Sequence, residues 1–144
     1  MNNEDRSLES RIRRLEDVNE IHALCIAYGY HIDRQEFDSY AHLFSEDGVW
    51  AGPPGEFKGP DAILAMLQQV MGPATGPSCH VITNPIIEID GDRASAHVIT
   101  MYVKEGADGS PNTAQVGHLD HTFIRERDGW KFLRRGGGRD IPRP

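Results

Sequence analysis

The hydrophobic pattern of the chain changes its period near residue 78. Before this point apolar residues recur at spacings of three and four, which predicts amphipathic helices. The clearest stripe comprises Leu8, Ile12, Leu15, Val18, Ile21, Leu24, Cys25 and Tyr28. From about residue 78 onward, β-branched residues and the alternation of apolar and polar residues predict strands at 78–84, 85–90, 93–104, 114–127 and 129–137. Helices followed by a run of strands indicate an α+β fold.

Turn signals divide each half of the chain. A second short helix is expected at about 34–44, a short strand at Val49 and Trp50, and a third helix from Pro60 to near Met71. Aspartate–glycine pairs at 90–91 and 128–129 predict hairpin turns between antiparallel strands. We therefore expect one domain over residues 1–144, in which a curved, mainly antiparallel sheet folds round the helices.

Composition excludes several classes of partner. The chain has a formal charge of −7 and a pI near 5.4, and its only basic cluster is Arg134, Arg135 and Arg139. Nucleic-acid binding needs a clustered positive field, so no such partner is expected. No stretch approaches the roughly 20 apolar residues of a membrane span, and the first residues lack the apolar core of a signal peptide, which predicts a cytoplasmic protein. Cys25 and Cys79 are expected to be small buried side chains rather than a disulfide.

Two ionisable residues stand where helical segments give way to other structure. Asp33 follows the first helix, and His80 lies in the first strand of the second half. A carboxylate that accepts a hydrogen bond from one imidazole nitrogen fixes the tautomer and leaves the other nitrogen as a base. Such a base, worth about 10²–10⁴-fold in rate, suits a weakly acidic C–H next to a carbonyl. Asp33 and His80 are therefore a candidate acid–base pair.

No metal site is expected. His118 and His121 point to opposite sides of a regular strand, and no zinc or iron ligand spacing occurs elsewhere. In that strand both faces mix apolar and ionisable side chains, so alternation does not say which face is inside.

Several motifs, in this order and spacing, resemble the SnoaL-like family of the nuclear transport factor 2-like superfamily. They are Tyr28 with IDRQEFD, then LFSEDGVW, FKGPDAI, CHVITNPIIEIDGD and FIRERDGWKF. The resemblance covers nearly the whole chain and implies a cone-shaped α+β barrel. Within the superfamily the chain is most similar to scytalone dehydratase, hexachlorocyclohexane dehydrochlorinase and bile acid 7α-dehydratase. Those enzymes are lyases without cofactors, which implies that this chain needs none.

The resemblance also implies roles for individual residues. In these relatives an aspartate after the first helix orients a histidine that removes a proton from carbon, and Asp33 and His80 match those positions. The bile acid enzyme further uses a tyrosine and an arginine, which match Tyr28 and Arg139, while its acidic residue on the third strand falls near Tyr102. Tyr28 or Tyr102 could protonate a departing hydroxyl, and Arg139 could hold a developing enolate or a leaving anion.

Two further residues are candidates to line the cavity or tune its charge, His118 and Asp120. Plainer interpretations stay open for the whole set. Asp33 with Glu36 fits the cap of a second helix. His80 can be a half-buried structural histidine, and Tyr28 can belong to the core stripe. Arg139, His118 and Asp120 can face solvent.

The sequence thus predicts a cofactor-independent lyase, of dehydratase or dehydrohalogenase type, acting on a hydrophobic, cyclic small molecule. Two alternatives stay open. One is an isomerase or polyketide cyclase that uses the same cavity, and the other is a non-catalytic ligand-binding or accessory subunit, because fold alone does not fix function. The resemblance also implies a homodimer or homotrimer formed through the outer face of the sheet.

Overall fold

The computed structural model describes residues 7–72 and 76–144, and in them helices precede most of the strands. The elements in chain order are α1 (Leu8–Asp33), α2 (Phe37–Ala41), β1 (Phe44–Gly52), β2 (Gly55–Lys58), α3 (Pro60–Val70), β3 (Ser78–Asp90), β4 (Arg93–Glu105), β5 (Pro111–Glu126) and β6 (Gly129–Ile141). None of the helices in this described part is long and apolar enough to cross a membrane.

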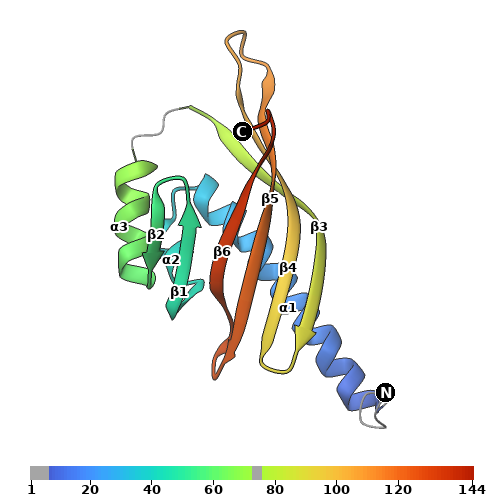
Figure 1. Cartoon of the computed structure of the whole chain (residues 1–144). Helices are drawn as coiled ribbons and strands as arrows, with labels where there is room; N and C mark the ends of the chain where they lie inside the picture. The colour runs from blue at the N-terminus through green and yellow to red at the C-terminus, as the bar shows by residue number, and fades with distance from the viewer. Residues whose placement is uncertain (1–6, 73–75) are drawn as a thin grey trace.

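One curved six-stranded sheet organises these elements. Its strand order is β2-β1-β6-β5-β4-β3, with β1 parallel to β6 and every other neighbouring pair antiparallel. The two edges, β2 and β3, do not pair with one another, so the cone is open along one side. Helix α1 runs across the inner face of the sheet, and α3 lies beside β1 and β2 (Figure 1). The predicted α+β cone is thus confirmed, as an unclosed sheet.

The apolar stripe of α1 is buried only from its second third onward. Ile21, Cys25, Tyr28 and Ile32 are buried against the sheet. By contrast Leu8 and Leu15 are each 69% exposed, because the first turns of α1 extend beyond the end of the sheet (Figure 1). The apolar stripe predicted from the sequence is therefore exposed over its first two turns.

A glycine sets how closely α1 approaches the sheet. Gly29 is buried, and a Cβ added there would lie 3.1 Å from Cγ1 of Ile82 and 3.3 Å from the carbonyl oxygen of His80. Any side chain at this position would push α1 away from β3. The close approach brings Asp33, one turn further along α1, beside β3.

Several predicted boundaries differ from the structure. The expected strands 78–84 and 85–90 form one strand, β3, with an irregularity between Thr83 and Ile86 where Asn84 has a φ of 53°. The expected helix at 34–44 is limited to the five residues of α2. Strand β6 continues past residue 137, since its consecutive glycines pair with β5 without any loss of register.

Burial identifies the inner face of β5. Leu119, His121 and Phe123 are buried, while Asp120 and Thr122 are exposed. The inner face of the sheet thus carries His121, and the outer face carries Asp120. Cys25 is buried and Cys79 is exposed, and both are free thiols, so the expected burial holds for Cys25 and is wrong for Cys79.

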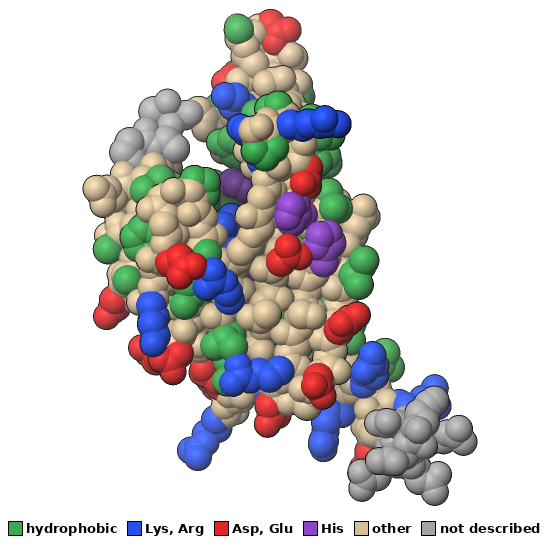
Figure 2. Space-filling model, in the orientation of Figure 1, with side chains coloured by type: hydrophobic (Ala, Val, Ile, Leu, Met, Phe, Trp, Pro, Cys, Tyr) green, Lys and Arg blue, Asp and Glu red, His purple; other side chains and the backbone are tan. Residues whose placement is uncertain are grey.

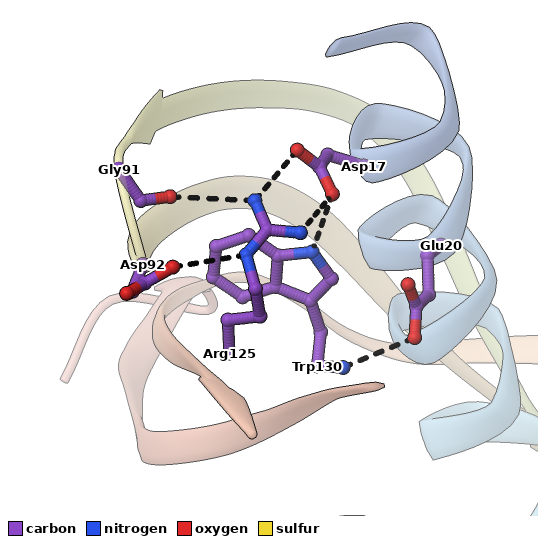
Figure 3. Close-up of polar contacts among 6 residues, drawn as sticks. All are labelled: Asp17, Glu20, Gly91, Asp92, Arg125 and Trp130. Atoms are coloured by element: carbon purple, nitrogen blue, oxygen red, sulfur yellow. Dashed lines mark hydrogen bonds and ion pairs between the residues drawn. The ribbon is translucent and has the colours of Figure 1, made fainter. Parts of the chain in front are cut away.

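An ion pair closes the end of the cone where α1 enters it (Figure 3). Arg125 of β5 donates two hydrogen bonds to the buried carboxylate of Asp17, at 2.6 and 2.8 Å, and its guanidinium lies 4.5 Å from the ring centre of Trp130. The indole of Trp130 donates to the same carboxylate at 3.0 Å, and Glu20 accepts from the backbone N–H of Trp130. Arg125 holds the pKa of Asp17 below its ordinary value. These contacts fix α1 to β5 and β6.

Candidate functional site

The opposite end of the cone contains a cavity of about 710 Å³. Its walls come from α1, β3, β4, β5 and β6, and Pro53 and Met71 close it on the side of α3. A smaller adjoining hollow of about 400 Å³ contains Asp33 and shares His80 and Tyr102 with the main cavity. The candidate residues can therefore be placed relative to one half-open cavity, whose volume is within the usual size range of small-molecule sites.

Asp33 and His80 are joined by three hydrogen bonds. Nδ1 of the His80 ring lies 2.6 Å from Oδ1 of Asp33, and the backbone N–H of His80 donates to both carboxylate oxygens, at 3.0 and 2.8 Å. The side chains are half-buried, with 22% of His80 and 19% of Asp33 exposed. Asp33 is the last residue of α1, and no side chain caps α2. The carboxylate is therefore not a cap of the second helix.

This geometry selects one tautomer of His80. An ionised carboxylate only accepts hydrogen bonds, so Nδ1 carries the proton that it shares with Asp33. Nε2 is then left as a lone-pair nitrogen, and no group among residues 7–72 and 76–144 forms a hydrogen bond with it. The ring of His80 borders the cavity and lies 4.9 Å from the ring of Tyr102, which also lines it. A base of this form can take a proton from a molecule bound in the cavity.

Tyr28 lies in the cavity wall on α1. Its hydroxyl accepts a hydrogen bond of 2.9 Å from Nε of Arg135 on β6. Arg135 also donates to the carbonyl oxygen of Ala51 at 2.6 Å, and its guanidinium lies 4.5 Å from the ring centre of Trp50. Burial raises the pKa of the neighbouring Tyr40 well above its ordinary value, so that phenol stays neutral. Two tyrosines line the cavity, Tyr28 and Tyr102, and Tyr28 is the one whose hydroxyl is bonded to an arginine.

Arg139 lies inside β6, whereas the expectation was a position just past the last strand. It borders the cavity near its mouth, and its guanidinium forms one long hydrogen bond, 3.4 Å, to the carbonyl oxygen of Arg143. It does not contact Tyr28. Sequence reasoning missed Arg135 as a site residue, although it lies four residues before Arg139 and so on the same face of a regular strand.

His118 and Asp120 belong to a cluster on the outer face of the sheet, where Figure 2 shows histidine and acidic side chains together. His97 lies 2.7 Å from Asp120, and the His118 ring bonds Asp140 at 2.9 Å, which raises the pKa of His118. The prediction that Asp120 lines the cavity is wrong, because odd-numbered residues of β5 occupy the inner face there. His118 does border the cavity, although its ring pairs with Asp140.

His121 is the buried ionisable residue that the sequence did not single out. It is 2% exposed, it packs against Tyr28, Phe123 and Phe132, and neither ring nitrogen has a hydrogen-bond partner in the structure. Burial, with a smaller contribution from the charge of Arg135, lowers the pKa of His121 to about 3. The imidazole is therefore neutral at physiological pH and lies in the core beneath Tyr28.

Within residues 7–72 and 76–144, no group of three or more histidine, cysteine, aspartate or glutamate side chains is arranged to hold a metal ion. In particular, the outer-face histidines each pair with a carboxylate instead of converging on one point.

Comparison with known proteins identifies the family. Residues 13–136 match the SnoaL-like domain. This chain belongs to the SnoaL-like family. An uncharacterized protein of Mycobacterium tuberculosis strain H37Rv is 30% identical over 137 residues, which cover 91% of this SnoaL-like chain and 90% of the relative.

Solved structures agree with this assignment. A nuclear transport factor 2-like protein with a cystatin-like fold from Novosphingobium aromaticivorans superposes with a TM-score of 0.81 at 26% identity, over 95% of this SnoaL-like chain and 92% of the other. A candidate aromatic ring hydroxylase from that organism has a TM-score of 0.76 at 26% identity, over 89% and 92% of the two chains. A candidate scytalone dehydratase, also from that organism, has a TM-score of 0.76 at 22% identity, over 89% and 87%. Two of these structural neighbours are thus named as candidate enzymes.

Proposed function

We propose that this SnoaL-like protein is a cofactor-independent lyase that removes water or a halide from a hydrophobic, cyclic small molecule. The observation that carries the proposal is the hydrogen bond between Asp33 and His80 at the wall of the cavity, with Nε2 of His80 left unbonded. Asp33 stabilises the imidazolium that forms when His80 takes a proton. A scaffold or carrier has no need for such a pair.

The reaction proceeds by loss of a proton and a leaving group from adjacent carbons. Nε2 of His80 removes a proton next to a carbonyl, the electrons of that C–H bond form a carbon–carbon double bond, and the bond to the leaving group breaks. Tyr28 protonates a departing hydroxyl, which leaves as water. The hydrogen bond that Arg135 donates to the Tyr28 oxygen stabilises the phenolate that results. The proton on His80 returns to Tyr28 through solvent.

Tyr102 lies beside His80 and contacts the substrate in this scheme. Its ring centre is 4.9 Å from that of His80, so it limits the positions that a bound ring can take against Nε2. The apolar parts of Met71 and Leu119 complete the cavity wall and favour a hydrophobic substrate.

A two-stage assay tests the proposal. Cyclic ketones without a leaving group are incubated in deuterated water, and exchange of the proton next to the carbonyl is followed by NMR. Cyclic β-hydroxy and β-chloro ketones are then followed by mass spectrometry for loss of water or hydrogen chloride. Exchange without any mass loss would favour the isomerase or cyclase alternative.

The variants His80→Ala and Asp33→Asn should lower exchange and elimination by about 10²–10⁴-fold while the proteins stay folded. The matched control is His97→Ala, because His97 forms a similar bond of 2.7 Å to Asp120 on the outer face of the sheet. That variant should retain full activity. Comparable activity in His80→Ala and wild type would remove the proposed mechanism.

A further inference from the structure

The charge of the cavity is opposite to that of the protein. The chain contains 22 acidic and 15 basic residues, yet the residues that line the main cavity include Arg135 and Arg139 and no aspartate or glutamate. The nearest catalytic carboxylate, Asp33, borders the adjoining hollow and is bonded to His80. A cavity whose lining carries two arginine side chains, in an otherwise acidic protein, favours an anionic ligand.

Arg135 is a fixed charge at the base of this cavity. Its contacts are all with neutral groups, namely the Tyr28 hydroxyl, the Ala51 carbonyl and the face of the Trp50 ring. Among the described residues, no carboxylate lies within ion-pairing distance of its guanidinium. The pKa of the neighbouring His121 is lowered mainly by burial, and the charge of Arg135 adds to this effect. Two of the arginine's nitrogens are occupied, so it serves best as an attractive charge and as support for Tyr28.

Arg139 has more free hydrogen-bond donors than Arg135, whose Nε and one terminal nitrogen are already bonded. Its guanidinium makes a single hydrogen bond, of 3.4 Å, to a backbone carbonyl, and in the described part of the chain it has no ion pair. Position 139 pairs with Gly117, and position 137 is a glycine that pairs with Leu119. Because neither glycine has a side chain, the strand surface between the two arginines is open. A free guanidinium binds a carboxylate through two parallel hydrogen bonds.

The strand register places Arg139 opposite the base. His80 pairs with Tyr102 on β4, and the neighbouring row of the sheet runs from Ile82 through Thr100 and Gly117 to Arg139. His80 and Arg139 are thus three strand spacings, about 14 Å, apart across the sheet, and two residues, about 7 Å, apart along the strands. A molecule that fills the cavity would contact Nε2 at one end and Arg139 at the other. The two small residues between them, Thr100 and Gly117, leave room for its body.

We propose that the substrate is an anion, a hydrophobic ring that carries a carboxylate remote from the reacting carbon, and that Arg139 binds this carboxylate. This inference rests on the proposed function for the reacting end of the molecule. It adds the substrate class and gives Arg139 a role in specificity, in place of holding an enolate. Arg135 strengthens binding of the anion through its charge and keeps Tyr28 in position.

Binding of matched ligands tests the inference without requiring turnover. The ligands are 2-naphthoate, its neutral amide 2-naphthamide, and 2-naphthyl phosphate, each titrated by calorimetry against wild type. The carboxylate should bind about 10- to 100-fold more tightly than the amide, which is the usual worth of a hydrogen-bonded charge pair. Arg139→Gln should remove most of this preference, because only the charge of Arg135 then remains, and Arg139→Lys should keep a larger part of it.

The control variant is Arg134→Gln, because Arg134 lies on the outer face of β6 and pairs with Glu56. It should keep the full preference for the carboxylate. Equal binding of acid and amide by wild type, or an unchanged preference in Arg139→Gln, would overturn the inference. Tighter binding of the phosphate than of the carboxylate would overturn its assignment to carboxylic acids.

The two proposals can fail separately. A preference for the carboxylate that persists in His80→Ala, in a protein that shows no proton exchange on any ketone, supports the anion site and contradicts the lyase. Proton exchange that depends on His80, with no preference among the naphthalene ligands, supports the lyase and contradicts the anion site. Binding and exchange therefore report on opposite ends of the same cavity.

Discussion

Replacing His121 by leucine should remove most of the acid sensitivity of the fold between about pH 7 and pH 5. His121 is buried without hydrogen-bond partners, and its pKa in the folded protein is lowered to about 3. In the unfolded chain a histidine has a pKa of about 6.5. At a pH between these two pKa values, the histidine is protonated in the unfolded chain and neutral in the folded protein. The free energy of unfolding therefore decreases as the pH falls below about 6.5.

The magnitude follows from the two pKa values. At about pH 5 the unfolded histidine is almost fully protonated, 1.5 units below its pKa, and each unit corresponds to about 1.4 kcal/mol. Relative to pH 7, His121 should therefore reduce the free energy of unfolding by about 2 kcal/mol. His118 acts in the opposite direction, because Asp140 raises its pKa and its stabilisation is gained as the pH falls. Both proteins contain His118, so the difference between them isolates His121.

The assay is urea unfolding of wild type and His121→Leu at about pH 7, 6 and 5, followed by tryptophan fluorescence. The control is His22→Leu, since His22 is an exposed histidine of α1. That variant should lose as much stability as wild type over the range. If His121→Leu also loses as much as wild type, burial does not hold the imidazole of His121 neutral, and the argument is refuted.

Two further variants test contacts in the scaffold. Asp17→Asn should cost about 1.5–3 kcal/mol in urea unfolding, because it removes the buried carboxylate that accepts hydrogen bonds from Arg125 and Trp130. Asp92→Asn alters an exposed carboxylate bonded to the same arginine and should cost under about 1 kcal/mol, and similar losses in both variants would contradict the assigned burial. Gly137→Ala should cost about 2–5 kcal/mol, because position 137 has a φ of 144° and an added Cβ would overlap the backbone of β5. At Gly136 the nearest atom would be 3.6 Å from that Cβ, so Gly136→Ala should change stability little by comparison, and the reverse order in thermal unfolding would refute the register.

The order of elements was predictable from the sequence because the hydrophobic period and the turn residues are local signals. The ends of the helices and strands were harder to predict. Two strands were expected at 78–84 and 85–90, but the ladder between β3 and β4 resumes at Ile86, beyond the left-handed Asn84, because pairing to a long neighbouring strand outweighs one irregular step. The exposure of Leu8 and Leu15 could not be read either, since an apolar stripe says which face of a helix is apolar and not where its partner ends.

The candidate site was accessible to sequence reasoning only in part. Asp33 and His80 were named from their types and positions, and the structure joins them by a hydrogen bond across 47 residues. Arg135 and His121 were not identified as site residues. In β5, which carries His121, both faces mix polar and apolar side chains, and its pairing with β6, which carries Arg135, shifts between Thr122 and Phe123. A shift of one residue exchanges the faces, so alternation alone does not place a side chain near such a bulge.

Helix α1 carries both the closing ion pair and the polar end of the cavity. Asp17 and Asp33 lie 16 positions apart on it, about 24 Å along its axis. Changes in the cavity wall are therefore distant from the contacts that attach the helix to the sheet. The walls can diverge in sequence, and with them the range of molecules accepted, while the attachment stays intact. For protein engineering, this division makes the chain a scaffold whose selectivity can be redesigned at one end without first repairing its stability at the other.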